Sequence, residues 1–175
     1  MIKKIFTLLL IATISISAIA QEKEKEDPTA FDVTKVGQKV PEFTFTTLDG
    51  KTINIRDLEG KTVLINFFAT WCGPCMKEMP QLEKQIWPEF KDKDFYMICL
   101  GRGHDAEELK KFQTKKGFSF PIAPDKDKSI YEKFFTRYIP RNVLVNAKGE
   151  IVFQEFGYTE ESFAHLIDLI RKETK

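Results

Sequence analysis

The chain has 175 residues, of which 42% are hydrophobic, and its 27 basic and 26 acidic side chains leave a net charge of +1. This length fits one domain, and 16 Phe residues supply bulk for a hydrophobic core. The balanced charge argues against nucleic acid as a partner, because that partner requires a basic face on the protein.

The N-terminus has the pattern of a secretory signal peptide. Lys3 and Lys4 precede an apolar run over residues 5–16, and Ala18-Ile19-Ala20 is the small-x-small pattern that a signal peptidase reads. We therefore expect residues 1–20 to be removed by cleavage after Ala20, and the protein to be exported to the periplasm. An uncleaved membrane anchor is the alternative, although the run is short for a span of about 20 residues.

The rest of the chain divides into a polar leader and a folded domain. Residues 21–35 begin with a charged stretch that lacks core-forming side chains up to Thr29, which predicts a mobile spacer. Residues 36–175 carry periodic apolar patterns and form the predicted domain.

The first half of this domain begins with strands. A hairpin is predicted over residues 41–55, where apolar and polar residues alternate around Asp49-Gly50. Residues 62–68 are apolar without alternation, which is typical of a strand buried on both faces. A helix is predicted from Met76 to near Trp87, because Pro88 disfavours helical backbone in the residue before it.

The second half predicts a strand over residues 94–100 and then a helix with Asp105 as its N-cap and Gly117 at its end. The remaining predicted elements are a short extended piece over 118–122, a helix over 129–135, a hairpin over 141–156 around Lys148-Gly149, and a final helix capped by Thr159 with apolar residues at helical spacing up to Ile170. This order predicts an α/β sandwich around a mixed central sheet.

Cys72 and Cys75 are separated by two residues at the junction between the buried strand and the next helix. This spacing places the thiols one helical turn apart, close enough to form a disulfide. The first thiol also faces the unpaired N–H groups and the positive end of the helix dipole, which favour its thiolate. Because the thiolate is the nucleophile in disulfide exchange, the motif predicts redox chemistry.

The third cysteine and the two histidines receive simpler interpretations. Cys99 lies in an apolar strand and is expected to be a buried hydrophobe, with a resolving or mixed-disulfide role as the alternative. His104 is expected to cap a loop, and His165 to lie on the solvated face of the last helix. The sequence holds no second CxxC and no ligand set at fixed spacing, so no metal site is predicted.

Several motifs occur together in one superfamily. They are the preface 36–60, the segment 66–75 with its Trp-Cys-Gly-Pro-Cys core, Glu78-Met79-Pro80, Tyr138-Ile139-Pro140 and the turn 146–151. On these motifs the chain resembles the thioredoxin superfamily, and within it the TlpA/ResA-like extracytoplasmic thioredoxins, over residues 36–172. The resemblance implies a thioredoxin fold: a mixed central β-sheet flanked by helices, with an N-terminal β-hairpin extension.

The resemblance also implies roles for residues around the cysteines. Cys72 matches the exposed attacking cysteine and Cys75 the buried resolving cysteine. Pro80 matches the proline that kinks this helix in thioredoxins, and Trp71 is expected to cover the disulfide. The pair Cys72–Cys75 would be the redox centre, with no other cofactor.

Pro140 forms the second part of the expected site. In the resembled family this proline is cis and packs against the CxxC motif, so that the backbone of Ile139 is presented to an extended substrate. Ile139 and Pro140 are therefore candidate substrate-binding residues, together with Trp71. Arg141 departs from the Thr often found after this proline, and this departure leaves the type of substrate open.

Glu78 is the candidate proton acceptor for the resolving thiol. Thioredoxin has a buried Asp beneath its disulfide, whereas this chain has Asn66, which cannot accept a proton. Glu78 lies three residues after Cys75, hence on the same side of the helix, and the resembled group has a functional acid at this position. A carboxylate buried there would have a raised pKa and could transfer a proton near neutral pH.

The leading hypothesis is an exported thiol–disulfide oxidoreductase that reduces disulfides of exported proteins. The Gly73-Pro74 dipeptide favours reduction, because thioredoxin has a potential of about −270 mV against about −120 mV for a strong periplasmic oxidant. Such a reductase needs a membrane electron donor, which the sequence does not identify, and we expect it to be monomeric.

Other functions remain as alternatives to this reductase. A disulfide oxidase or isomerase would use the same cysteines in another direction, and a copper or haem-chaperone module would use them as ligands. A peroxiredoxin-type peroxidase shares the N-terminal preface, but its Pro-x-x-x-Thr-x-x-Cys setting is missing around Cys72.

Overall fold

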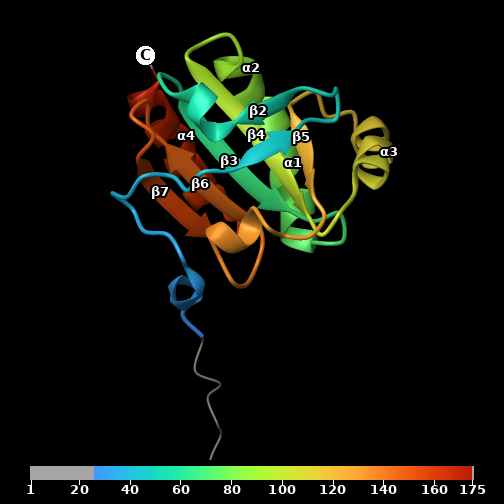
Figure 1. The fold of residues 1–175 in the computed structure, drawn as a ribbon, viewed down its shortest axis with the longest axis horizontal. Coiled ribbons are helices and arrows are strands. Elements are labelled where there is room, and N and C mark those ends of the chain that lie inside the picture. Colours follow the sequence, from blue (N-terminus) through green and yellow to red (C-terminus); the bar gives the residue numbers. More distant parts are fainter. Residues whose placement is uncertain (1–25, 175) are drawn as a thin grey trace, which may run out of the picture.

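The computed structural model of the protein describes residues 26–174, so the predicted signal peptide and the first five residues of the leader lie outside the described residues. A five-stranded sheet in the order β5-β4-β3-β6-β7 forms its centre (Figure 1). Strands β3, β4 and β5 pair in parallel, whereas β6 pairs antiparallel with both β3 and β7, which confirms the mixed sheet. The strands are β3 (Thr62–Phe68), β4 (Phe95–Arg102), β5 (Ile122–Asp125), β6 (Arg141–Val145) and β7 (Ile151–Phe156).

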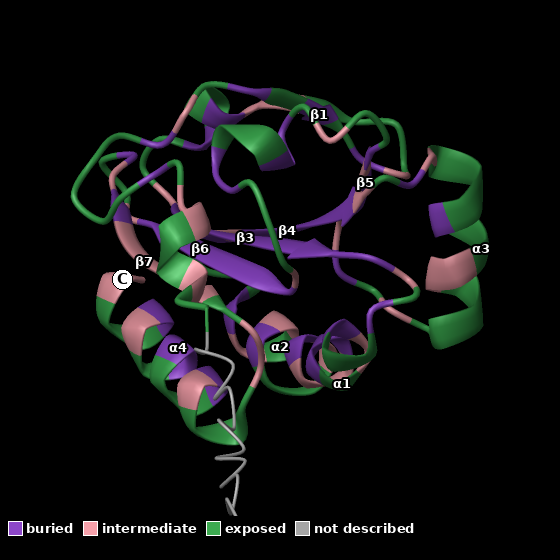
Figure 2. Ribbon diagram, turned by 90° about the horizontal axis from the view of Figure 1, so that it is seen from below, coloured by how far each residue is buried: buried purple, intermediate pink, exposed green. Residues whose placement is uncertain are grey.

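Helices cover one face of the sheet and a small hairpin covers the other (Figure 2). The helical face carries α1 (Gly73–Gln81), α2 (Trp87–Phe90) and α4 (Glu160–Glu173), whereas α3 (Ala106–Lys116) flanks the edge at β5. The opposite face carries the antiparallel strands β1 (Thr44–Thr46) and β2 (Thr52–Asn54), which confirm the N-terminal hairpin. Short helical turns complete the fold: η1 (Pro28–Phe31), η2 (Ile55–Leu58), η3 (Leu82–Ile86) and η4 (Tyr131–Lys133).

Strand β3 is buried along its whole length, as its unbroken apolar sequence predicts. Its side chains alternate between two separate clusters, because successive residues of a strand point to opposite faces. Leu64 and Phe68 pack with the helices, whereas Val63, Ile65 and Phe67 pack with the hairpin and η4. Asn66 therefore points toward the helical face, and it is fully buried there.

The helix after the cysteines continues beyond the position where we expected it to end. It passes through the π-helical turn η3, where the Trp87 N–H donates to the Leu82 carbonyl five residues back, and resumes as α2 up to Phe90. Pro88 occupies the start of α2, where a missing N–H costs no helical hydrogen bond. The expectation of an end ahead of Pro88 was therefore wrong.

Two other predicted elements also differ. Strand β5 begins at Ile122 instead of 118, because the ladder with β4 starts where Ile122 pairs with Cys99. The predicted helix over 129–135 is reduced to the three-residue turn η4. After this turn the Phe134 carbonyl accepts the N–H groups of Val33 and Thr34, and Phe135 forms a bridge with Asp32, so the chain pairs with the N-terminal segment instead of continuing as a helix. The capped helices α3 and α4 and the hairpin β6–β7 are confirmed.

Part of the predicted leader is folded against the domain. Asp32 forms a bridge with Phe135, and its carboxylate lies 2.8 Å from the guanidinium of Arg141, which is 1% exposed. Arg141 also donates to the Pro28 carbonyl at 2.8 Å. The charge of Arg141 is thus paired with Asp32 inside the protein. Within residues 26–174, no helix has both the length and the apolar composition needed to cross a membrane.

Candidate active site

Cys72 and Cys75 lie where the sheet meets its first helix, and they form a disulfide. Residues 69–72 lead from the end of β3 into α1, and Cys72 is the N-cap of that helix. The Cys75 N–H donates to Cys72 Sγ at 3.2 Å, so an otherwise unpaired N–H group is placed to stabilise negative charge on this sulfur once the disulfide is reduced. The predicted placement of the motif at a helix start is confirmed.

Only one of the two sulfurs borders a pocket. Cys75 is fully buried, whereas Cys72 retains 5% exposure and lines a pocket of about 370 Å³. Cys72 is therefore much less exposed than the resemblance implied. Trp71 is 70% exposed and lines the same pocket.

The loop before β6 forms the opposite wall of this pocket. The Ile139–Pro140 peptide bond is cis, as expected from the resemblance, and the Ile139 carbonyl oxygen lies 3.8 Å from Cys72 Sγ. Tyr138 precedes it with a φ of 69°, a left-handed conformation that bulky residues rarely adopt. The hydroxyl of buried Tyr131 donates to the Tyr138 carbonyl at 2.6 Å and holds this loop in place.

A row of polar side chains crosses the sheet beneath α1. Asn66 on β3 pairs in register with Cys99 on β4 and with Asn142 on β6, and Asn142 pairs in turn with Glu155 on β7. Because residues in register point to the same face of a sheet, these four side chains share the helical face. Glu78 on α1 lies above the row and is 1% exposed.

Both oxygens of the Glu78 carboxyl group accept hydrogen bonds from this row. Asn142 Nδ2 lies 2.5 Å from Oε1, and Asn66 Nδ2 lies 2.9 Å from Oε2. Asn66 Nδ2 also donates to Asn142 Oδ1 at 2.9 Å. Burial raises the pKa of Glu78 to about 7, although the two amide donors favour the charged form and oppose this rise. The expected raised pKa therefore has burial as its main cause.

The remaining cysteine and histidines match their simpler interpretations. Cys99 is fully buried and carries a free thiol, and burial raises the pKa of this thiol well above its usual value. His104 Nε2 accepts the Thr70 N–H at 3.1 Å, which caps the turn before Trp71. His165 is exposed on α4. Among residues 26–174, no three His, Cys, Asp or Glu side chains cluster as metal ligands would.

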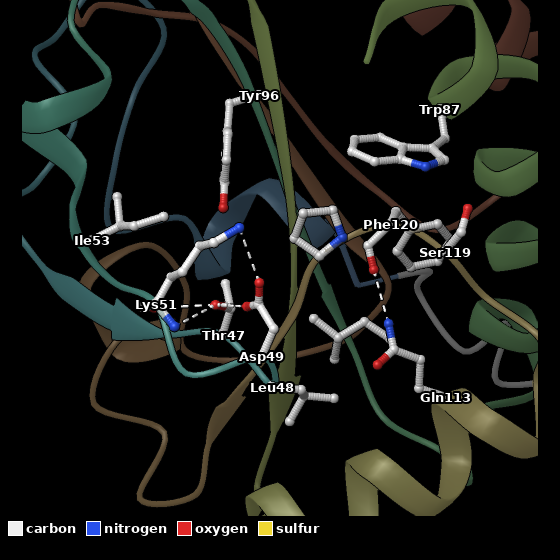
Figure 3. Close-up of a pocket in the computed structure, with 12 residues that line it drawn as sticks. Thr47, Leu48, Asp49, Lys51, Ile53, Trp87, Tyr96, Gln113, Ser119 and Phe120 are labelled. Carbon is white, nitrogen blue, oxygen red and sulfur yellow. Dashed lines mark hydrogen bonds and ion pairs between the residues drawn. The ribbon is translucent and has the colours of Figure 1, made fainter. Parts of the chain in front are cut away.

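A second cavity of about 400 Å³ lies between the β1–β2 hairpin and the segment before β5. Figure 3 shows Lys51 and Asp49 on one side of it and Trp87 and Phe120 on the other. No cysteine lines this cavity. Of the predicted site residues, Trp71, Cys72 and Ile139 therefore line the pocket, Glu78 lies at the buried row, and Cys75 and Pro140 are buried; none of the six lines the second cavity.

Sequence reasoning missed two residues at the site, Asn142 and Arg102. Asn142 is a polar residue directly before the apolar run 143–145, and Arg102 is a charged residue at the end of an apolar strand. Each stands at the boundary of an apolar run, which is the signal that could have identified it. Their partners were not evident, because Glu78 and Asn142 are 64 residues apart in the sequence.

Comparison with known proteins places the chain in a family. The family model described as Redoxin matches residues 35–168. The chain belongs to the redoxin family. A relative from Halalkalibacterium halodurans, the thiol-disulfide oxidoreductase ResA, is 33% identical over 142 residues, which cover 81% of this chain and 80% of the relative. ResA of Bacillus thuringiensis is 36% identical and covers 70% of each chain.

Solved structures in the same superfamily share the fold. The solution structure of a proposed protein disulfide isomerase from Bacteroides thetaiotaomicron matches with a TM-score of 0.79 and 37% identity, over 82% of this chain and 92% of that one. These matches confirm the predicted thioredoxin fold and the resemblance to ResA-like proteins.

Proposed function

We propose that this protein is an exported thiol–disulfide oxidoreductase that reduces disulfides in other exported proteins. The observation that carries the proposal is the Cys72–Cys75 disulfide at the start of α1, with Cys72 lining a pocket and Cys75 buried. The relatives named thiol-disulfide oxidoreductase ResA support the same chemistry.

The reaction begins with the reduced protein. The Cys72 thiolate attacks one sulfur of the client disulfide, and the other client sulfur leaves as a thiolate that takes up a proton. Cys75 then attacks Cys72 Sγ, which breaks the mixed disulfide and releases the second client thiol. Two electrons and two protons pass to the client, and the protein retains the disulfide that the structure shows.

The second step requires a proton acceptor for the Cys75 thiol. We assign this role to Glu78, which lies one helical turn from Cys75 on the buried face of α1. Its pKa of about 7 suits an acceptor that works near neutral pH, because the carboxylate and carboxylic acid forms are then close in free energy.

The client binds, in this proposal, along the loop that holds Ile139 and Pro140. The carbonyl oxygen of Ile139 lies beside Cys72 Sγ, so a client in extended conformation can pair with this backbone while its disulfide meets the sulfur. Trp71 provides an exposed apolar wall for the same client.

The setting of the reaction follows from the N-terminal sequence. We propose a periplasmic monomer whose signal peptide is cleaved after Ala20, and whose disulfide is reduced again by a membrane electron donor. The Gly73-Pro74 dipeptide supports the reducing direction.

The reduction potential of the Cys72–Cys75 pair tests this function. We expect a value of about −250 mV or lower when the mature protein is equilibrated with thiol redox buffers. A value between about −180 and −120 mV would assign an oxidase or isomerase role instead. If no disulfide forms in solution, the redox function is wrong and a metal-binding role of the thiols must be tested, for which copper(I) titration is the direct measurement.

Trapping experiments test the roles of the two cysteines. A Cys75→Ser variant is expected to accumulate a stable mixed disulfide with a disulfide-containing client. Cys72→Ser should form none, because Cys75 has no exposed surface. The opposite pattern would reverse the assignment of attacking and resolving cysteines.

A further inference from the structure

Arg102 provides the one charge among the residues that line the pocket beside Cys72. The other lining residues are uncharged: Trp71, Cys72, Gly73, Pro74, Tyr138 and Ile139. A client bound over Cys72 therefore meets a single cation next to the sulfur that attacks it.

The fold places Arg102 at the reactive edge of the sheet. It is the last residue of β4, and the preceding residue, Gly101, pairs in register with Phe68 at the end of β3. The chain leaves β3 at the same edge to reach Cys72. Ligands of α/β proteins commonly bind at the carboxyl ends of parallel strands, and Arg102 lies at that position.

The guanidinium group is held in a fixed orientation by an aromatic ring. Its central carbon lies 4.5 Å from the ring centroid of Tyr131, which is fully buried. The hydroxyl of Tyr131 is in turn anchored to the Tyr138 carbonyl, on the wall of the same pocket. Stacking of this kind orders an arginine without using its hydrogen-bond donors.

The donors of Arg102 lack an acidic partner within residues 26–174. The ion pairs in this part of the chain use other arginines, namely Arg56, Arg137, Arg141 and Arg171. Arg102 Nε is buried and makes no hydrogen bond. The residue in register with it, Asp125, directs its carboxylate to the N–H groups of Ile130 and Tyr131. A carboxylate is the natural complement of such a guanidinium, because two N–H groups can bind its two oxygens.

We propose that Arg102 binds a side-chain carboxylate of the client, so that the protein prefers disulfides whose cysteine is flanked by Asp or Glu. The inference rests on the proposed function, since it concerns the substrate of that same site. Arg102 acts here by binding the client, and it takes no part in the transfer of electrons.

Peptide substrates test this preference. Three peptides with one internal disulfide and amidated C-termini differ only at the residues flanking the cysteines, which are Glu, Gln or Lys. Amidation leaves the side chains as the source of the carboxylate. With the reduced wild-type protein we expect the second-order rate constant for the Glu peptide to exceed that for the Gln peptide about tenfold, and the Lys peptide to react more slowly still.

Matched variants connect the preference to Arg102. Arg102→Met should bring the Glu-to-Gln ratio close to one, and Arg102→Glu should favour the Lys peptide. Lys77→Met removes an exposed positive charge from α1 outside the pocket, and it should leave the ratio unchanged. If Arg102→Met does not fold, the wild-type ratio provides the test, because it should fall as salt screens the ion pair.

Several outcomes would overturn the inference. If the wild-type protein reduces the three peptides at equal rates, Arg102 does not bind a client carboxylate, although the proposed function stands. An Arg102→Met variant that slows all three peptides equally would assign Arg102 to stabilisation of the Cys72 thiolate. If the wild-type protein reduces none of them, the proposed function itself fails.

Discussion

Asn142 Nδ2 donates a 2.5 Å hydrogen bond to Glu78 Oε1, which joins the second residue after Pro140 to the candidate proton acceptor on α1. Asn66 holds the other carboxyl oxygen. Two neutral donors thus stabilise the charged form of a carboxyl group whose burial favours the neutral form. The pKa of Glu78 near 7 results from this opposition, and it depends on both amides.

Replacement of Asn142 should therefore change the pH dependence of the reaction. Asn142→Val removes a donor to the carboxylate, so the pKa of Glu78 rises and the resolving step needs a higher pH. We expect the midpoint of its pH–rate profile to move upward by about one unit, since a hydrogen bond to a charged group contributes about 1.5–3 kcal/mol. The rate of client thiol release in single turnovers between pH 5 and 9 measures this. Asn146→Ala, in the β6–β7 turn, is the control, and an unchanged midpoint for Asn142→Val would contradict the role of the amide.

Glu78 should also affect stability as the pH changes. Its pKa is about 7 in the folded protein and 4.5 for an unperturbed carboxyl group, so the folded state holds this proton at pH values where the unfolded chain has lost it. The stabilisation is fully present below pH 4.5 and is lost as the pH rises to about 7, by about 3 kcal/mol in total. Urea unfolding of the oxidised protein and of Glu78→Gln across this range isolates the contribution, because other carboxyl groups titrate in both proteins. If the free energies of unfolding of the two proteins change with pH in parallel, Glu78 does not retain its proton in the folded state.

Cys99 should be chemically silent in the folded protein. Its thiol is fully buried and its pKa lies well above the usual value, so little thiolate is available for reaction. After reduction of the disulfide, a thiol reagent should modify at most two cysteines under native conditions and all three in denaturant. The Cys99→Ala variant should reduce clients at the wild-type rate. Rapid native labelling of a third thiol, or loss of activity in the variant, would restore a functional role for Cys99.

The N-terminal segment should contribute to the stability of the domain through Asp32. Asp32→Asn leaves the buried guanidinium of Arg141 without its counter-charge, which we expect to lower the free energy of unfolding by about 3 kcal/mol. Asp168→Asn breaks an exposed ion pair with Arg171 and should change stability by less than about 1 kcal/mol. Urea unfolding of the three proteins at neutral pH gives the comparison. Equal stability of Asp32→Asn and the wild type would show that residues 27–35 do not support the domain.

Local patterns predicted the elements that depend on local physics. The unbroken apolar run of β3, the turn Lys148-Gly149 and the caps Asp105 and Thr159 each act within a few residues, and each was placed correctly. The end of the first helix was not, because the π-helical turn η3 shifts the backbone so that Pro88 fits. That shift arises in the folded helix, and the presence of one proline in the sequence does not indicate it.

Long-range partners explain the rest of what the sequence left open. Arg141, whose departure from the usual Thr left the type of substrate open, pairs its charge with Asp32, 109 residues away. The Glu78 site was expected from its spacing to Cys75, whereas the amides that hold its carboxyl group come from two different strands. Such hydrogen-bonded groups of residues can be identified only once the register of β3 and β6 is known.

The polar row beneath α1 has a consequence for engineering. The centre of this sheet, where most proteins of this size place their best-packed aliphatic side chains, instead holds two amides and a carboxyl group, and Asn66 Oδ1 has no hydrogen-bond partner there. Replacement of a buried polar set by apolar residues of similar volume often raises stability. Redesign of Asn66, Glu78 and Asn142 for heat resistance should therefore succeed thermodynamically and yield a protein with an intact disulfide and a slow second step. Thermal screening alone would select for inactive enzymes at this position.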